Sequence, residues 1–391
     1  MLPADLRPGL RLAAALLCLV LPAAAAAEAL WAEVRAPRSH ELLRGPVGLT
    51  EVRGWAGTGV RGSHDVVLVI DRTASTFDVS GVDVDGDGQV GRRLAGFKQL
   101  RVVSDPGDTI QAAQLLAARR LIEKLDSSTT RMGIVTFSQT EQVLARIGTP
   151  RRSLLAALDG LPARPGPGGT YFYGALIASI KVFEQAPRDG AAGRHRSIIF
   201  LSDGLPNRPD PPAAAAKAAV RASQHARNAD IRIYAFALRP EVASRPEVFL
   251  DMTRANGGEL LFVEQPAEIV DFVPHMSLTR LERVELENLT ASKPGRAVRL
   301  FPDGTFDGYV QLVPGENRLR VTVYGEGGGV RSLEHVVRFE QTAADNAEAR
   351  RRLEALLAEI RLRTLETQLA EEVKVRRKRA LARQLEIKVE R

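Results

Sequence analysis

Five oxygen-bearing side chains fall in three segments that lie far apart in the sequence. Asp71, Thr73 and Ser75 alternate in the first segment, Thr170 follows a pair of glycines, and Asp203 follows a serine. Carboxylate and hydroxyl oxygens are hard ligands, and no histidine or cysteine accompanies them. The set therefore predicts a site for Mg²⁺ or Mn²⁺.

Buried strands are expected to bring these segments together. Residues 65–71 and 197–202 are apolar runs that end at or just before an acid, which is typical of parallel strands. Ligands of a doubly wound α/β sheet bind at the carboxyl ends of its strands, where the five side chains would meet. Asp108 is expected to cap the first helix. The other strands are expected at 132–137, 231–238 and 260–263, and helices at 109–125, 153–158, 173–184, 212–228, 246–256 and 266–276.

These residues, in this order, resemble the metal-ion-dependent adhesion site of the von Willebrand factor type A family. The family motif is Asp-x-Ser-x-Ser with a Thr and an Asp from later loops, and Thr73 replaces the first Ser while keeping its hydroxyl. The resemblance covers residues 64–276 and implies a doubly wound, mostly parallel sheet. It also implies a bound Mg²⁺ with an open position that an acidic residue of a partner protein fills. The resemblance thus indicates a binding module rather than an enzyme.

A second acidic motif lies in a long insertion, residues 76–108. Carboxylates occupy the first, third and fifth positions of an EF-hand-type loop, with glycine at the sixth and an apolar residue at the eighth. The twelfth position is Leu94 instead of a bidentate Glu, so another acid must complete a Ca²⁺ shell. Such an ion would order the rim of the binding surface; the alternative is a Gly-Asp turn without an ion. The candidate ligands are Asp83, Asp85, Asp87, Gln89, and Asp105 or Asp108.

Short alternating strands flank the α/β region on both sides, in residues 28–62 and 280–341. Each segment alone has too few strands for a good sandwich, but together they resemble one bacterial immunoglobulin-like domain. The α/β domain is then inserted into a loop of this split β-sandwich. The alternative is a separate N-terminal β-segment that packs on the α/β domain.

Residues 343–391 contain no Gly or Pro, which predicts one long helix or two. Two apolar stripes run out of phase along it, so a coiled coil has no sustained heptad repeat to support it. Six bases and no acids lie between residues 374 and 383. This basic segment either contacts an anionic envelope surface or an acidic partner, or belongs to an amphipathic helix that folds back on the protein.

Residues 1–27 are typical of a secretory signal, with a basic start, an apolar run and a small-residue cleavage site. The single cysteine, Cys18, lies within it, which excludes disulfides and thiol chemistry in the mature chain. We expect an exported protein of the periplasm, the cell surface or the medium. Its net charge of +7 is mild, and no nucleic-acid partner is expected.

Two other function classes stay open. Asp71 and Asp203 would also suit a metal-dependent phosphoesterase, although the sequence shows no general base or phosphate-binding cation. In the third class, an envelope protein uses the metal only to stabilise its fold.

Overall fold

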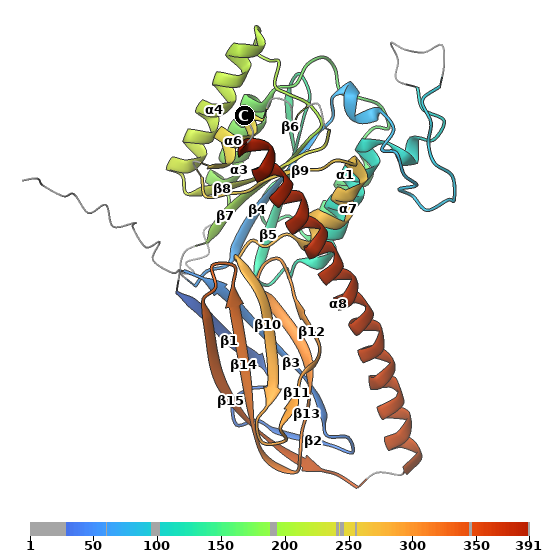
Figure 1. The fold of residues 1–391 in the computed structure, drawn as a ribbon, viewed down its shortest axis with the longest axis vertical. Helices are drawn as coiled ribbons and strands as arrows, with labels where there is room; N and C mark the ends of the chain where they lie inside the picture. Colours follow the sequence, from blue (N-terminus) through green and yellow to red (C-terminus); the bar gives the residue numbers. More distant parts are fainter. Residues whose placement is uncertain are drawn as a thin grey trace, which may run out of the picture.

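The computed structural model describes residues 29–389 except 60, 95–101, 188–193, 240–241, 243–245, 255 and 344–345. The expected signal, residues 1–27, lies outside the described residues. The chain forms an α/β unit, a β unit and a long C-terminal helix (Figure 1).

One mostly parallel sheet forms the centre of the α/β unit. Its strand order is β6-β5-β4-β7-β8-β9, and only the pair β5–β6 is antiparallel. The apolar side chains of β4 are buried because helices cover both faces of the sheet. A mixed α/β fold with a parallel-rich sheet is therefore confirmed. The strands are β4 (His64–Asp71), β5 (Thr130–Phe137), β6 (Glu141–Ala145), β7 (His195–Ser202), β8 (Ile231–Ala237) and β9 (Leu260–Phe262).

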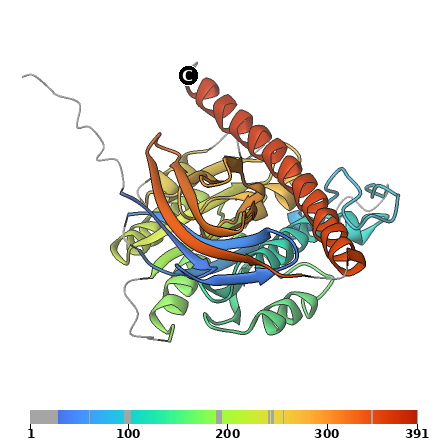
Figure 2. The same ribbon diagram turned by 90° about the horizontal axis from the view of Figure 1, so that it is seen from below.

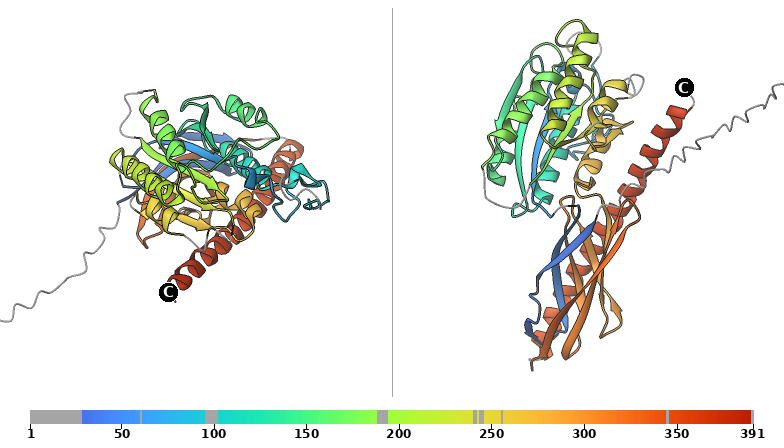
Figure 3. Two further views of the ribbon diagram at one scale, coloured as in Figure 1. Left: turned by 90° about the horizontal axis from the view of Figure 1, so that it is seen from above. Right: turned by 90° about the vertical axis from the view of Figure 1, so that its left-hand side faces the viewer.

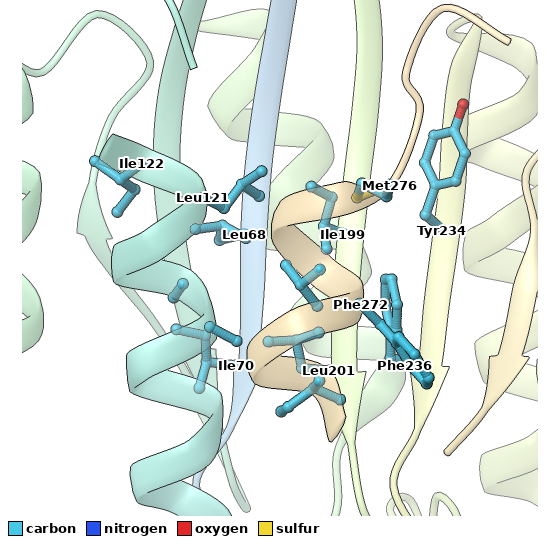
Figure 4. Close-up of a cluster of buried hydrophobic side chains, with 14 of the residues drawn as sticks. Leu68, Ile70, Leu121, Ile122, Ile199, Leu201, Tyr234, Phe236, Phe272 and Met276 are labelled. Carbon is cyan, nitrogen blue, oxygen red and sulfur yellow. The ribbon is translucent and has the colours of Figure 1, made fainter. Parts of the chain in front are cut away.

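The helices divide into two layers. One face carries α1 (Ile110–Lys124), α2 (Arg151–Asp159) and α7 (Ile269–Phe272), and Figure 4 shows Leu121 and Phe272 packed over Leu68 and Ile199 of the sheet. The other face carries α3 (Phe172–Glu184), α4 (Pro212–Asn228) and α6 (Glu247–Arg254).

Two expectations about helices, the cap of the first helix and the continuity of the last one in the α/β unit, were wrong. The cap of α1 is Thr109, whose side chain accepts a hydrogen bond from the Ala112 amide, because the Asp108 carboxylate binds two amides of the acidic loop. The helix expected at 266–276 is divided into η3 (Pro266–Glu268), α7 and η4 (Val273–His275). Each 3₁₀ turn has a proline in its first positions, and proline cannot donate to a preceding turn.

Strands from both ends of the chain build the β unit. Its two sheets have the orders β1-β3-β13-β12 and β11-β10-β14-β15-β2, and they share one apolar core that includes Val52, Phe306 and Val321. The chain leaves this unit after β3 and returns at β10, with the α/β unit between them (Figure 3). The strands are β1 (Leu30–Ala36), β2 (Leu42–Gly45), β3 (Leu49–Thr58), β10 (Leu281–Asn288), β11 (Lys293–Pro294), β12 (Arg296–Leu300), β13 (Thr305–Gln311), β14 (Gly315–Gly325) and β15 (Val330–Gln341).

The C-terminal segment is one helix, α8 (Asn346–Val389), which runs beside the β unit and on to the α/β unit (Figure 1). Figure 2 shows that α8 lies outside the sheets of the β unit. Its basic segment lies against the protein: Arg376 pairs with Asp271 at 2.8 Å and Arg377 with Glu259 at 2.6 Å. The helix therefore folds back, and contact with an anionic surface stays a prediction. Across the described part of the chain, no helix is long and apolar enough to cross a membrane.

Candidate metal centre

The carboxyl edge of the parallel sheet collects the predicted metal ligands. Asp71 ends β4, and Thr73 and Ser75 lie at the start of the η1 turn (Ala74–Phe77) that follows. Asp203 directly follows β7, which pairs with β4 in parallel, and Thr170 lies two residues before α3. Adjacent parallel strands end at the same edge, so residues far apart in sequence become neighbours.

Four of the five residues form a continuous hydrogen-bond network. The Thr73 amide donates to Asp71 Oδ1 at 2.8 Å, and the Ser75 hydroxyl donates to Asp203 Oδ1 at 2.7 Å. The hydroxyl oxygens of Thr73 and Ser75 lie 3.0 Å apart. Ser202, directly before Asp203, donates its hydroxyl proton to Asp71 Oδ2 at 2.5 Å. The structure thus brings Asp71, Thr73, Ser75 and Asp203 together.

Thr170 reaches the same place through a glycine-rich turn. Its amide donates to Asn207 Oδ1 at 2.7 Å, and its hydroxyl oxygen lies 3.9 Å from the position a Cβ would take on Gly204. Gly168 has a φ of +64°, and a Cβ there would meet the side chain of Gln139 at 1.9 Å. The turn therefore requires a glycine to hold Thr170 beside the loop of Asp203.

Two carboxylates share this buried site. Asp71 is 0% and Asp203 3% exposed. Burial and the nearby Asp203 carboxylate raise the pKa of Asp71 to about 7. A divalent cation would offset both effects, since it supplies positive charge to two desolvated acids. The donor set of two carboxylates and three hydroxyls fits Mg²⁺ or Mn²⁺.

Arg239 is a cation at this site that sequence reasoning missed. It follows β8, and its Nε lies 2.9 Å from Asp203 Oδ2. Its Nη2 donates to the Ser75 carbonyl at 3.0 Å and to Asp78 Oδ2 at 3.2 Å. The available signal was its position two residues after β8, which ends at the same sheet edge as β7.

A comparison with protein-family models matches part of the α/β unit. Residues 101–205, which include Thr170 and Asp203, match the family model described as von Willebrand factor type A domain. The chain contains a von Willebrand factor type A domain. Asp71, Thr73 and Ser75 precede the matched residues.

Several solved structures are similar to the chain at low identity. A von Willebrand factor type A protein from Catenulispora acidiphila has 14% identity over 83% of this chain and 75% of that chain, with a TM-score of 0.39. Three N-terminal domains of the type V pili tip protein Mfa5 from Porphyromonas gingivalis have 11% identity over 80% of this chain and 78% of that chain, with a TM-score of 0.37. Proximal thread matrix protein 1 from the mussel byssus, with a zinc-occupied MIDAS motif, has 13% identity over 54% of this chain and 44% of that chain, with a TM-score of 0.37. No curated protein matches the sequence.

The acidic loop that begins at Asp83 folds back on its own C-terminal end. Carboxylate oxygens of Asp83, Asp85 and Asp108 lie within 4.8 Å of one another, and so do those of Asp85, Asp87 and Asp105. Both acids proposed to complete the shell therefore reach the loop.

Asp108 holds this loop closed. Its two carboxylate oxygens accept the Val84 amide at 2.5 Å and the Gly91 amide at 2.7 Å. The Asp87 amide lowers the pKa of Asp85, but desolvation and the neighbouring carboxylates outweigh it, so the pKa of Asp85 is raised overall. The side chain of Gln89 is exposed and donates a hydrogen bond to Asp87 Oδ2 at 3.4 Å.

Proposed function

We propose that this chain is an exported, non-enzymatic binding module that recognises an acidic residue of a partner protein through a metal. The residues that would hold Mg²⁺ or Mn²⁺ are Asp71, Thr73, Ser75, Thr170 and Asp203. The observation that carries the proposal is the hydrogen-bond network that joins both carboxylates to the two hydroxyls of the first segment.

The charge of the site favours an anionic partner. Only two of the five proposed ligands are charged, and Arg239 already faces one of them. The two carboxylates balance the charge of a divalent cation, so the Arg239 guanidinium leaves the site with a net positive charge that attracts a carboxylate. The residues of the chain position the ligands and exclude water from Asp71, which is fully buried.

We further infer that Ca²⁺ binds the acidic loop and orders the rim beside the metal centre. Asp83, Asp85, Asp87, Asp105 and Asp108 are the acidic candidates for its shell, with Gln89 beside them. The loop is tied to the metal segment because the Ser80 amide donates to the Asp108 carbonyl at 2.8 Å. Ordering the loop would therefore restrict the segment that follows Ser75.

The β unit supports a third inference, that residues 28–62 and 280–341 form an immunoglobulin-like sandwich with the von Willebrand domain inserted. Its two sheets, built from both segments around one core, are the observation in favour. In this arrangement the sandwich presents the inserted domain, whose metal edge lies at the ends of β4 and β7.

Calorimetric titration tests both ion sites. We expect Mg²⁺ to bind the wild-type protein, with Asp203→Asn abolishing this isotherm and Asp85→Asn leaving it unchanged. Ca²⁺ binding should be lost in Asp85→Asn and unchanged in Asp203→Asn. A wild-type protein that takes up neither Mg²⁺ nor Mn²⁺ would contradict the proposed module.

Water relaxation tests the open position for a partner carboxylate. Mn²⁺ loaded into the protein should give a high water relaxation rate, which acetate should lower by replacing a bound water. The same concentration of chloride is the control. A relaxation rate that acetate leaves unchanged would contradict recognition of acidic residues while leaving metal binding intact.

A further inference from the structure

A cavity of about 680 Å³ lies where α8, the β unit and the α/β unit meet, away from the metal centre. The β unit contributes Leu281, Val284 and Val298, and α8 contributes Leu369 and Val373. Its volume falls within the range of about 300–1,000 Å³ that is usual for sites binding small molecules. The apolar part of the wall suits an alkyl chain.

Lys124, the last residue of α1, also lines this cavity. Its side chain is half-buried, and in the described ranges that side chain makes no hydrogen bond or ion pair with another residue. Burial lowers the pKa of Lys124 to about 8; the charges of Lys374 and Arg299 act in the same direction, and the Glu366 carboxylate acts against them. An ammonium group in such a place lacks a counter-ion.

Three of the acids that line the cavity pair directly with other bases. Glu366 binds Arg299 at 2.8 Å, and Glu371 binds Lys374 at 2.8 Å. Asp271 lies 2.8 Å from Arg376. The positive charge of Lys124 thus remains available in a cavity that is lined both by apolar side chains and by these charged pairs.

We propose that this cavity binds an anionic amphiphile, a single alkyl chain whose head group is a carboxylate like that of a fatty acid. The head group pairs with Lys124, while the chain lies between Val298 and Leu281 of the β unit and Val373 of α8. Such a ligand bridges all three parts of the molecule and holds α8 in place.

Titration of the purified protein with laurate tests this proposal. We expect saturable binding with one laurate per chain, and about tenfold or greater weakening in Lys124→Met, which keeps the length of the side chain and removes its charge. Lys217→Met, at an exposed position of α4, is the matched control and should bind like the wild type. Equal affinity in Lys124→Met and wild type would overturn the proposal.

Two further measurements separate this cavity from the exposed leucines of α8. Val298→Trp fills the cavity and leaves the exposed Leu362 and Leu365, which do not line it, unchanged; it should abolish laurate binding. Dodecyltrimethylammonium, with the same chain length and the opposite charge, should not compete with laurate. Unchanged binding to Val298→Trp, or displacement by the cationic amphiphile, would each overturn the assignment.

Discussion

At the residue scale, Arg239 sets the charge of the metal centre. Its guanidinium lies 2.9 Å from Asp203 and bridges to Asp78, so it neutralises a buried acid in the absence of a metal. The same positive charge repels a divalent cation bound a few ångströms away. It therefore competes with the metal for Asp203.

Arg239→Met should raise the affinity for Mg²⁺ roughly tenfold, or about 1.4 kcal/mol, because a repelling charge is removed. The metal-free variant should melt at a lower temperature than wild type, since Asp203 loses its partner. Calorimetric titration and thermal unfolding with and without Mg²⁺ measure both effects. If the affinity instead falls, Arg239 acts mainly by positioning Asp203.

His64 makes the fold sensitive to acid. It is 2% exposed at the start of β4. Burial lowers the pKa of His64 to about 3, with His195 and Arg194 acting in the same direction. Above its unfolded pKa of 6.5, the side chain is neutral in both states and contributes no pH dependence. Between 6.5 and about 3 only the unfolded chain takes up the proton, so the free energy of unfolding falls as the pH falls.

We expect this slope to reach about 1.4 kcal/mol per pH unit for His64, and to be reduced by that amount in His64→Gln. Urea unfolding at a series of pH values below about 7 measures it. His225→Gln, at an exposed position of α4, serves as the control and should retain the wild-type slope. A slope that His64→Gln leaves unchanged would show that other groups govern the acid response.

At the scale of elements, α8 packs through charged contacts as well as through its buried Ile360 and Val373. Arg363 has an exposed fraction of 13%, donates to Glu51 at 2.6 Å and lies over the ring of Tyr309 at 4.9 Å. Leu362 and Leu365 on the same helix are more than half exposed. Partly buried arginines therefore contribute to the packing of α8.

Arg363→Met should loosen α8 from the β unit and make it more sensitive to protease, since a partly buried ion pair and a cation–π contact are both lost. We expect a loss of about 2 kcal/mol in stability. Limited proteolysis followed by mass spectrometry would show earlier cleavage within α8. Arg361 is exposed on the same helix, so Arg361→Met is the control and should be cleaved like the wild type.

The elements that the sequence predicted share a strong local signal. The strands at 65–71 and 197–202 were evident because burial on both faces produces uninterrupted apolar runs. β6 was missed because three of its five residues are exposed at the edge of the sheet. The candidate metal ligands were predicted from strand ends, whereas the position of Arg239 depends on which strand lies beside β7. The order of strands in a sheet and the contacts of α8 both depend on residues far apart in the sequence, and the local hydrophobic pattern does not reveal them.

At the scale of the whole molecule, one buried acid joins the β unit to the α/β unit. Asp303, in the turn between β12 and β13, is fully buried. Its Oδ2 accepts hydrogen bonds from the Thr129 hydroxyl at 2.8 Å and from the Asp126 amide at 3.1 Å, just before β5. Its Oδ1 accepts the Thr305 hydroxyl at 2.7 Å within the β unit. Each carboxylate oxygen therefore serves a different unit.

Asp303→Ala should leave several buried donors without an acceptor and cost about 3 kcal/mol or more. The loss falls on the junction rather than on either core, so cooperativity between the units should suffer most. We expect calorimetry of the wild type to show one unfolding transition and the variant to show two, the first at a lower temperature. Asp251→Ala, an exposed acid on α6, should melt like the wild type. A variant that retains one transition at the wild-type midpoint would show that α8, which also contacts both units, suffices to couple them.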